Sequence, residues 1–160
     1  MLNALRICLL VLGLSAAAIA LSIFCFGAAF TAAWSETLFN LVSGWRGPAT
    51  GGWAPTMDSE LRFYAALWGA YGLVVTRTAM NLPGRFKEVP WLAAVFFVGG
   101  VGRLLSRLSL GPPHPFFTLL LVIEVSLPVI IMALWMGASP ERDREAGSKP
   151  GVAGDGGHLR

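Results

Sequence analysis

The chain has 160 residues, of which 55% are hydrophobic and only 13% are charged, and its mean hydropathy is +0.64. Soluble domains carry roughly 25% charged residues, so this composition excludes an ordinary soluble fold and indicates a single membrane domain. The net charge of +3 is small and dispersed. The sequence has no basic stripe with interleaved aromatic residues, which is the pattern that predicts nucleic-acid binding.

The first predicted element is a transmembrane helix over residues 7–34. It lies in an uncharged run of 29 residues, 7–35, that follows Arg6, and a membrane span needs only about 20. A signal peptide is the alternative, but its apolar region is ~7–15 residues long, which is shorter than this run. Cys8 and Cys25 would lie about 25 Å apart along this helix at ~1.5 Å per residue, so we predict no disulfide between them.

Residues 41–56 are rich in glycine and proline and predict an irregular connection outside the hydrocarbon or against protein. The second span is predicted over residues 59–76, with Asp58 as its N-cap. Glu60 and Arg62 then lie at the mouth of this span. Its small residues, which allow close contact between helices in membranes, are Ala65, Gly69 and Gly72.

The third span is predicted over residues 89–110 and contains a glycine cluster and two arginines. Arg103 and Arg107 are four residues apart, so they lie on one helix face, and Ser106 lies beside them. The glycine cluster lacks the strand–turn–helix setting of a phosphate-binding loop, so close helix packing is the better explanation. Its members are Gly99, Gly100 and Gly102.

The fourth span is predicted over residues 116–137, after a proline-rich turn that contains His114. Glu124 lies inside this span. Pro128 has no N–H to donate to the carbonyl of Glu124, so we predict a kink there and a free acceptor at the depth of the acid. The remaining residues, 138–160, are rich in glycine and mixed charge and predict a disordered tail.

Together these segments predict an all-α fold, an integral membrane four-helix bundle whose principal partner is the lipid bilayer. The amino end, the connection between the second and third spans, and the tail together carry eight of the 12 Lys and Arg residues. The positive-inside rule therefore places both termini, and the tail, in the cytoplasm. The small-residue faces of the second and third spans are suited to self-association as well as to packing within one chain.

Arg103 and Glu124 are predicted to lie at a similar depth, ~10–12 Å below the outer ends of their spans at ~1.5 Å per residue. An unpaired charge at the helix centre costs ~2.5–3.5 kcal/mol on insertion scales, so such side chains face inward and find partners. We therefore predict an ion pair between Arg103 and Glu124. Glu36, Asp58 and Glu88 are predicted to be solvated.

Three functions are compatible with these charges. The first is an ion-pair clasp that sets helix register without a ligand. The second is an outward-opening pocket for a lipid or small anionic ligand, since arginines outnumber acids near this layer. The third is a transporter component or a membrane enzyme that acts on a lipid or polar small molecule. The predicted ligand-binding residues are Glu60, Arg62, Arg103, Ser106, Arg107, His114 and Glu124.

The sequence contains no nucleophile–base pair, metal-ligand spacing or nucleotide motif. We therefore predict no catalytic residue, no cofactor and no metal site, and we favour a binding or structural membrane module over an enzyme. Glu124 and His114 are an acid and a base in principle, but nothing in their spacing predicts that they approach each other.

Several blocks of the chain resemble, in the same order, the family catalogued as domain of unknown function 4345. The blocks are residues 58–64, 97–106, 111–115 and 124–128, and the Gly-Gly-x-Gly-Arg-Leu-Leu-Ser motif is the most specific of them. The resemblance covers roughly residues 5–135. It implies a small four-helix protein of the bacterial inner membrane, and it implies no activity.

Overall fold

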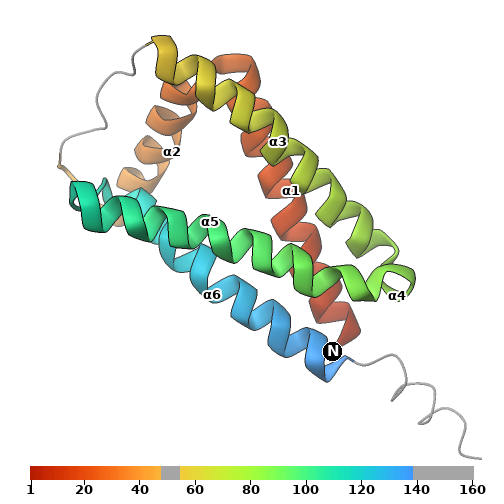
Figure 1. The fold of residues 1–160 in the computed structure, drawn as a ribbon. Helices are drawn as coiled ribbons and strands as arrows, with labels where there is room; N and C mark the ends of the chain where they lie inside the picture. Colours follow the sequence, from red (N-terminus) through yellow and green to blue (C-terminus); the bar gives the residue numbers. More distant parts are fainter. Residues whose placement is uncertain (48–54, 139–160) are drawn as a thin grey trace, which may run out of the picture.

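The computed structural model describes residues 1–47 and 55–138, and within these ranges the fold is all-α (Figure 1). The predicted disordered tail lies outside the described residues, apart from its first residue. The elements in chain order are α1 (Leu2–Phe26), α2 (Ala28–Ser43), α3 (Pro55–Met80), the short α4 (Leu82–Arg85), the 3₁₀ helix η1 (Phe86–Glu88), α5 (Val89–Leu110) and α6 (Pro115–Gly137).

Three segments of the described chain are long and apolar enough to cross a membrane, and this indicates a multi-pass membrane protein. They are α1, the segment Leu82–Leu110 and α6. α3 is not among them, because it carries Asp58, Glu60 and Arg62 near its start and Arg77 near its end. A fourth span over residues 59–76 therefore stays a prediction.

The first predicted span, residues 7–34, is not one helix. α1 ends at Phe26, and α2 begins at Ala28 after a turn at Gly27. The φ angle of Gly27 is +89°, a conformation that residues with a Cβ rarely adopt. A Cβ at Gly27 would also lie 2.8 Å from Nη2 of Arg62 and 2.9 Å from Oδ1 of Asp58. The apolar run is therefore longer than the helix because the backbone turns at a residue without a side chain.

α1 and α3 form an antiparallel pair that packs through small residues (Figure 1). A Cβ at Gly72 would lie 2.7 Å from both the backbone nitrogen of Ala17 and the backbone oxygen of Gly13. A Cβ at Gly13 would contact the side chain of Thr76. These backbone atoms have no room to move, so the two helices lie as close as glycine permits. The predicted role of Gly72 in close helix contact is confirmed.

α5 and α6 form the second antiparallel pair, and the two pairs join at one end only (Figure 1). A cluster of buried apolar side chains from α1, α3, α4, α5 and α6 fills this end, and it includes Leu9, Val75, Leu82, Val89 and Ile131. Tyr71 and Trp135 each donate a hydrogen bond of 2.9 Å to a backbone oxygen on a neighbouring segment. Away from this joint the pairs diverge, and α2 lies across the open end.

Gly72→Ala is expected to destabilise the protein by about 1–3 kcal/mol, because the new methyl group meets backbone atoms on α1. The matched control is Gly99→Ala on α5, where a Cβ would meet nothing within 4 Å. Alanine is favoured over glycine in a helix by roughly 0.5–1 kcal/mol, so this control is neutral or stabilising. Reversible denaturant unfolding in detergent micelles measures both changes. Equal effects of the two substitutions would show that the α1–α3 contact is not tight.

Candidate functional site

The predicted ion pair between α5 and α6 is confirmed. Nε of Arg103 donates to Oε2 of Glu124 at 2.7 Å, and Glu124 is only 8% exposed. The two helices approach closely at the same level, because a Cβ at Gly100 would lie 3.0 Å from Cβ of Glu124. Gly100 thus has the packing role that the sequence predicts, and the ion pair lies at the contact between the helices.

Gly99 and Gly102 do not share this role. A Cβ at either position would meet nothing within 4 Å, and both residues are exposed. The prediction that they pack against another helix is therefore not met within the described residues. The reason is rotational, since residues one position before and two after Gly100 point away from the face that meets α6.

A pocket of about 400 Å³ lies between the end of α5 and the start of α6. It brings together Arg103, Ser106, Arg107 and His114, four of the seven predicted ligand-binding residues, and Glu124 adjoins it through Arg103. Its remaining lining residues are apolar: Pro113, Phe117 and Leu121.

The charge in this pocket is unbalanced. Nη1 of Arg107 donates to the hydroxyl of Thr118 at 2.8 Å, which is a neutral partner. Within residues 1–47 and 55–138, no carboxylate forms an ion pair with Arg107. Arg103 is paired with Glu124, and its guanidinium also lies 5.9 Å from the centre of the Phe117 ring, within range of a cation–π contact. Two guanidinium groups therefore face one carboxylate.

His114 is both the N-cap of α6 and a wall of the pocket. Its Nδ1 accepts a hydrogen bond from the backbone N–H of Phe116 at 3.2 Å. Since Nδ1 is an acceptor, the neutral ring carries its proton on Nε2. That atom is buried and has no hydrogen-bond partner among the described residues. The ring is held edge-on by Phe39 and Trp45, at centroid distances of 6.0 and 6.1 Å.

Sequence reasoning missed Phe117, Thr118 and Phe39 as neighbours of the site. Phe117 and Thr118 lie one turn or less into α6, where only the geometry of the turn at residues 111–114 sets which side chains face Arg103 and Arg107. Phe39 reaches His114 because the chain bends at Gly27 and brings α2 to the start of α6. The contact between Phe39 and His114 could not be predicted from the sequence, because the sequence did not reveal the bend at Gly27.

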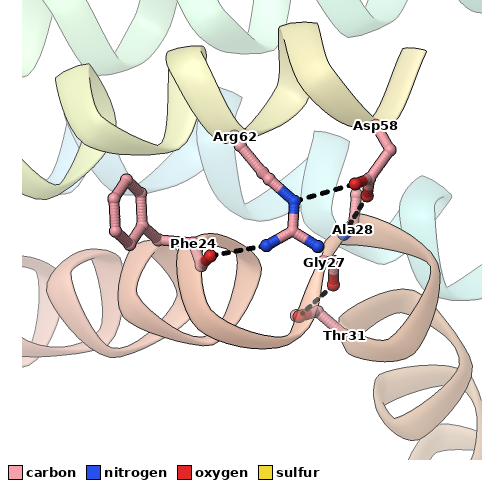
Figure 2. Close-up of polar contacts among 6 residues, drawn as sticks. All are labelled: Phe24, Gly27, Ala28, Thr31, Asp58 and Arg62. Atoms are coloured by element: carbon pink, nitrogen blue, oxygen red, sulfur yellow. Dashed lines mark hydrogen bonds and ion pairs between the residues drawn. The ribbon is translucent and has the colours of Figure 1, made fainter. Parts of the chain in front are cut away.

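Glu60 and Arg62 do not join this pocket. Arg62 lies at the corner between α1, α2 and α3 (Figure 2), where its Nε donates to Oδ2 of Asp58 at 2.8 Å and its Nη1 donates to the carbonyl of Phe24 at 2.7 Å. Glu60 is exposed. The predicted ligand-binding residues therefore fall into two separate groups, one on α3 and one between α5 and α6. Similar depth in the membrane does not place residues on the same pair of helices.

Asp58 is not the N-cap of its own helix, as the sequence suggested, because α3 already begins at Pro55. Instead its Oδ1 accepts from the backbone N–H of Ala28 at 3.2 Å, which caps α2 (Figure 2). A carboxylate at the start of α2 and a guanidinium at the end of α1 both match the helix dipoles.

Glu36 and Glu88 are not simply solvated either. Glu36 on α2 is 2% exposed. Glu88 accepts a hydrogen bond from the hydroxyl of Thr78 at 2.7 Å and one from Nη1 of Arg85 at 2.6 Å. Thr78 is buried at the end of α3, so this contact ties α3 to the start of α5. In the part of the chain that the structure describes, no group of three or more His, Cys, Asp or Glu side chains could hold a metal ion.

Residues 4–135 match the model of a protein family described as Domain of unknown function (DUF4345). This match confirms the resemblance found in the sequence, with nearly the same coverage. No curated protein and no solved structure matches the chain.

Arg103→Ala is expected to destabilise the protein by about 3–5 kcal/mol, because it leaves the carboxylate of Glu124 buried without its cation. The double variant Arg103→Ala/Glu124→Gln is expected to be less destabilised than the sum of the two single variants. Denaturant unfolding of all four proteins in detergent gives this coupling energy. As a control, Arg85→Ala combined with Glu124→Gln is expected to be additive, since Arg85 pairs with Glu88 instead. Additivity within about 0.5 kcal/mol for the Arg103 cycle would refute the coupling.

Proposed function

Since the chain belongs to the family described as Domain of unknown function (DUF4345), we propose a function from its geometry. The protein is a membrane-embedded binding module that holds an anionic group in the pocket between α5 and α6. The observation that carries this proposal is the charge imbalance of the pocket, where Arg103 and Arg107 face a single acid, Glu124.

The environment makes an anion the natural occupant. A guanidinium with only a neutral hydroxyl partner is costly in an apolar setting, and an anion supplies the missing charge. The guanidinium group also presents its donors as a planar fork that matches phosphate or carboxylate oxygens. Ser106, which also lines the pocket, adds a hydroxyl donor.

Two sources of such an anion share this chemistry. One is the phosphate of an anionic lipid, whose acyl chains would extend from the apolar wall of Phe117 and Leu121. The other is a small free anion such as inorganic phosphate. The competing function is a ligand-free clasp, in which the Arg103–Glu124 pair only fixes the register of α5 and α6.

We further propose that α3 crosses the membrane beside α1, which makes four spans in the inner membrane of a bacterium with both termini in the cytoplasm. The support is the close antiparallel packing of α1 and α3 through Gly13 and Gly72, together with the excess of Lys and Arg on one side. In this arrangement the α5–α6 pocket opens outward.

Arg107→Ala is expected to weaken anion binding by about 10–100-fold, because a hydrogen bond to a charged group contributes about 1.5–3 kcal/mol. Native mass spectrometry of detergent-extracted protein, titrated separately with phosphatidylglycerol and with inorganic phosphate, measures the bound mass. Arg77→Ala, the same substitution at an exposed residue outside the pocket, is the matched control and is expected to bind like the wild type.

Each result of this titration has a distinct meaning. Retention of lipid by the wild type and its loss in Arg107→Ala assign a lipid headgroup, whereas retention of phosphate alone assigns a free anion. If neither mass is retained, or if all three proteins retain it equally, the pocket is not an anion site and the clasp is favoured.

Four spans predict opposite sides of the membrane for Arg46 and Lys87, both of which are exposed. In a background without Cys8 and Cys25, Arg46→Cys is expected to react with a membrane-impermeant thiol reagent in intact cells. Lys87→Cys is expected to react only after permeabilisation. Equal labelling of the two would mean that α3 does not cross, and the reverse pattern would contradict the cytoplasmic termini.

A further inference from the structure

α2 exposes a continuous apolar face that no part of the described chain covers. Its members are Phe30, Trp34, Leu38 and Leu41. Spacings of four, four and three residues place them along one side of the helix. Their exposed fractions range from 43% at Leu38 to 80% at Leu41.

The polar residues Glu36 and Asn40 of α2 lie on the side that faces the protein. Glu36 is 2% exposed, and Oδ1 of Asn40 is also buried. Phe39 lies between these two on the same side and contacts the rings of His114 and Phe116. In a soluble protein an amphipathic helix turns its apolar stripe to the core and its polar side to water. α2 has the reverse orientation.

The apolar face continues onto a candidate membrane-spanning helix. Phe24 and Phe26 at the end of α1 are exposed, and Phe26 contacts Phe30 across the turn, with ring centres 5.4 Å apart. α2 itself has 16 residues, or about 24 Å at ~1.5 Å per residue, which is shorter than the ~30 Å hydrocarbon layer. α2 is thus joined to a membrane face but is too short to cross.

The helix break that precedes α2 has partners for its backbone groups within the protein. A break leaves backbone groups at both helix ends without partners, and irregular backbone is tolerated at membrane depth only where protein or a water-filled cavity satisfies it. At Gly27, Arg62 donates to the carbonyl of Phe24, and Asp58 accepts from the N–H of Ala28 (Figure 2). The hydroxyl of Thr31 donates to the carbonyl of Gly27 at 3.0 Å.

We propose that α2 is a membrane-embedded helix that does not span, and that its Phe30–Trp34–Leu38–Leu41 face contacts lipid acyl chains. The reversed polarity of α2 and the continuity of its apolar face with α1 are independent observations, and both indicate hydrocarbon as the surroundings of this face. The surface is separate from the pocket between α5 and α6, and its occupant does not depend on what that pocket binds.

Site-directed spin labelling of the full chain in phosphatidylcholine–phosphatidylglycerol vesicles tests the proposal. Single cysteines replace Phe30, Trp34, Leu38 and Leu41 in turn, in a background of Cys8→Ala and Cys25→Ser. The collision rates with oxygen, which partitions into lipid, and with a water-soluble nickel chelate are compared. Leu21→Cys, at an exposed position of α1, and Lys87→Cys, in the short turn before α5, serve as lipid and water references.

The expected result is an oxygen-to-nickel ratio on the α2 face that matches Leu21→Cys and exceeds Lys87→Cys. A ratio at all four positions that matches Lys87→Cys would overturn the proposal in favour of a water-exposed helix. Low access to both reagents with dipolar broadening between labels would overturn it in favour of contact with a second copy of the chain. Far-ultraviolet circular dichroism of each variant verifies that the helices are retained.

Discussion

Most charged side chains that enter the apolar part of the described chain pair with other groups of the protein, and the cost of leaving a charge unpaired there orders the structure. Water is the usual partner of an exposed carbonyl or carboxylate, and a bilayer does not supply it. Arg103 and Glu124 therefore meet at the contact between α5 and α6. Arg62 and Asp58 satisfy the two helix ends at Gly27, and Glu88 takes its hydrogen bonds from Thr78 and Arg85.

These three polar contacts have different structural roles, because they lie at different places in the two helix pairs. The contact at Glu88 lies beside the apolar joint and closes the end where both pairs meet. The corner at Gly27 directs α2 across the open end. The ion pair at Glu124 lies within the α5–α6 pair. The pocket and the lipid-facing side of α2 thus occur at the end of the molecule where packing between the pairs is weakest.

The sequence predicted the class of fold and the Arg103–Glu124 pair. Both follow from the position of a residue along its apolar run and from the free energy of leaving a charge unpaired in the membrane. Counting residues along two apolar runs places both charges at one level. Because an unpaired charge is unfavourable there, the two side chains are expected to pair. Depth carries no information about rotation around the bundle, so Arg62 and Glu60 were grouped with the wrong pair of helices. The break at Gly27 was missed because an uncharged run has the same composition whether its backbone turns or not.

The glycine cluster of α5 shows the same limit at the scale of one turn. Small residues predict close approach, but only Gly100 meets Glu124, whereas Gly99 and Gly102 face open space. A helix rotates by about 100° per residue, so adjacent glycines cannot all share one contact.

The ion pair and the proposed anion pocket lie next to each other because one helix register places both. Glu124 neutralises Arg103 and sets the register of α5 against α6 at Gly100. Arg107 lies one turn further along α5, and the same register brings it to Thr118, a partner without charge. A pair that served only as a clasp would leave no reason for a second guanidinium in this position. The charge of Arg107, which forms no ion pair among the described residues, is the feature on which the proposal of a bound anion rests.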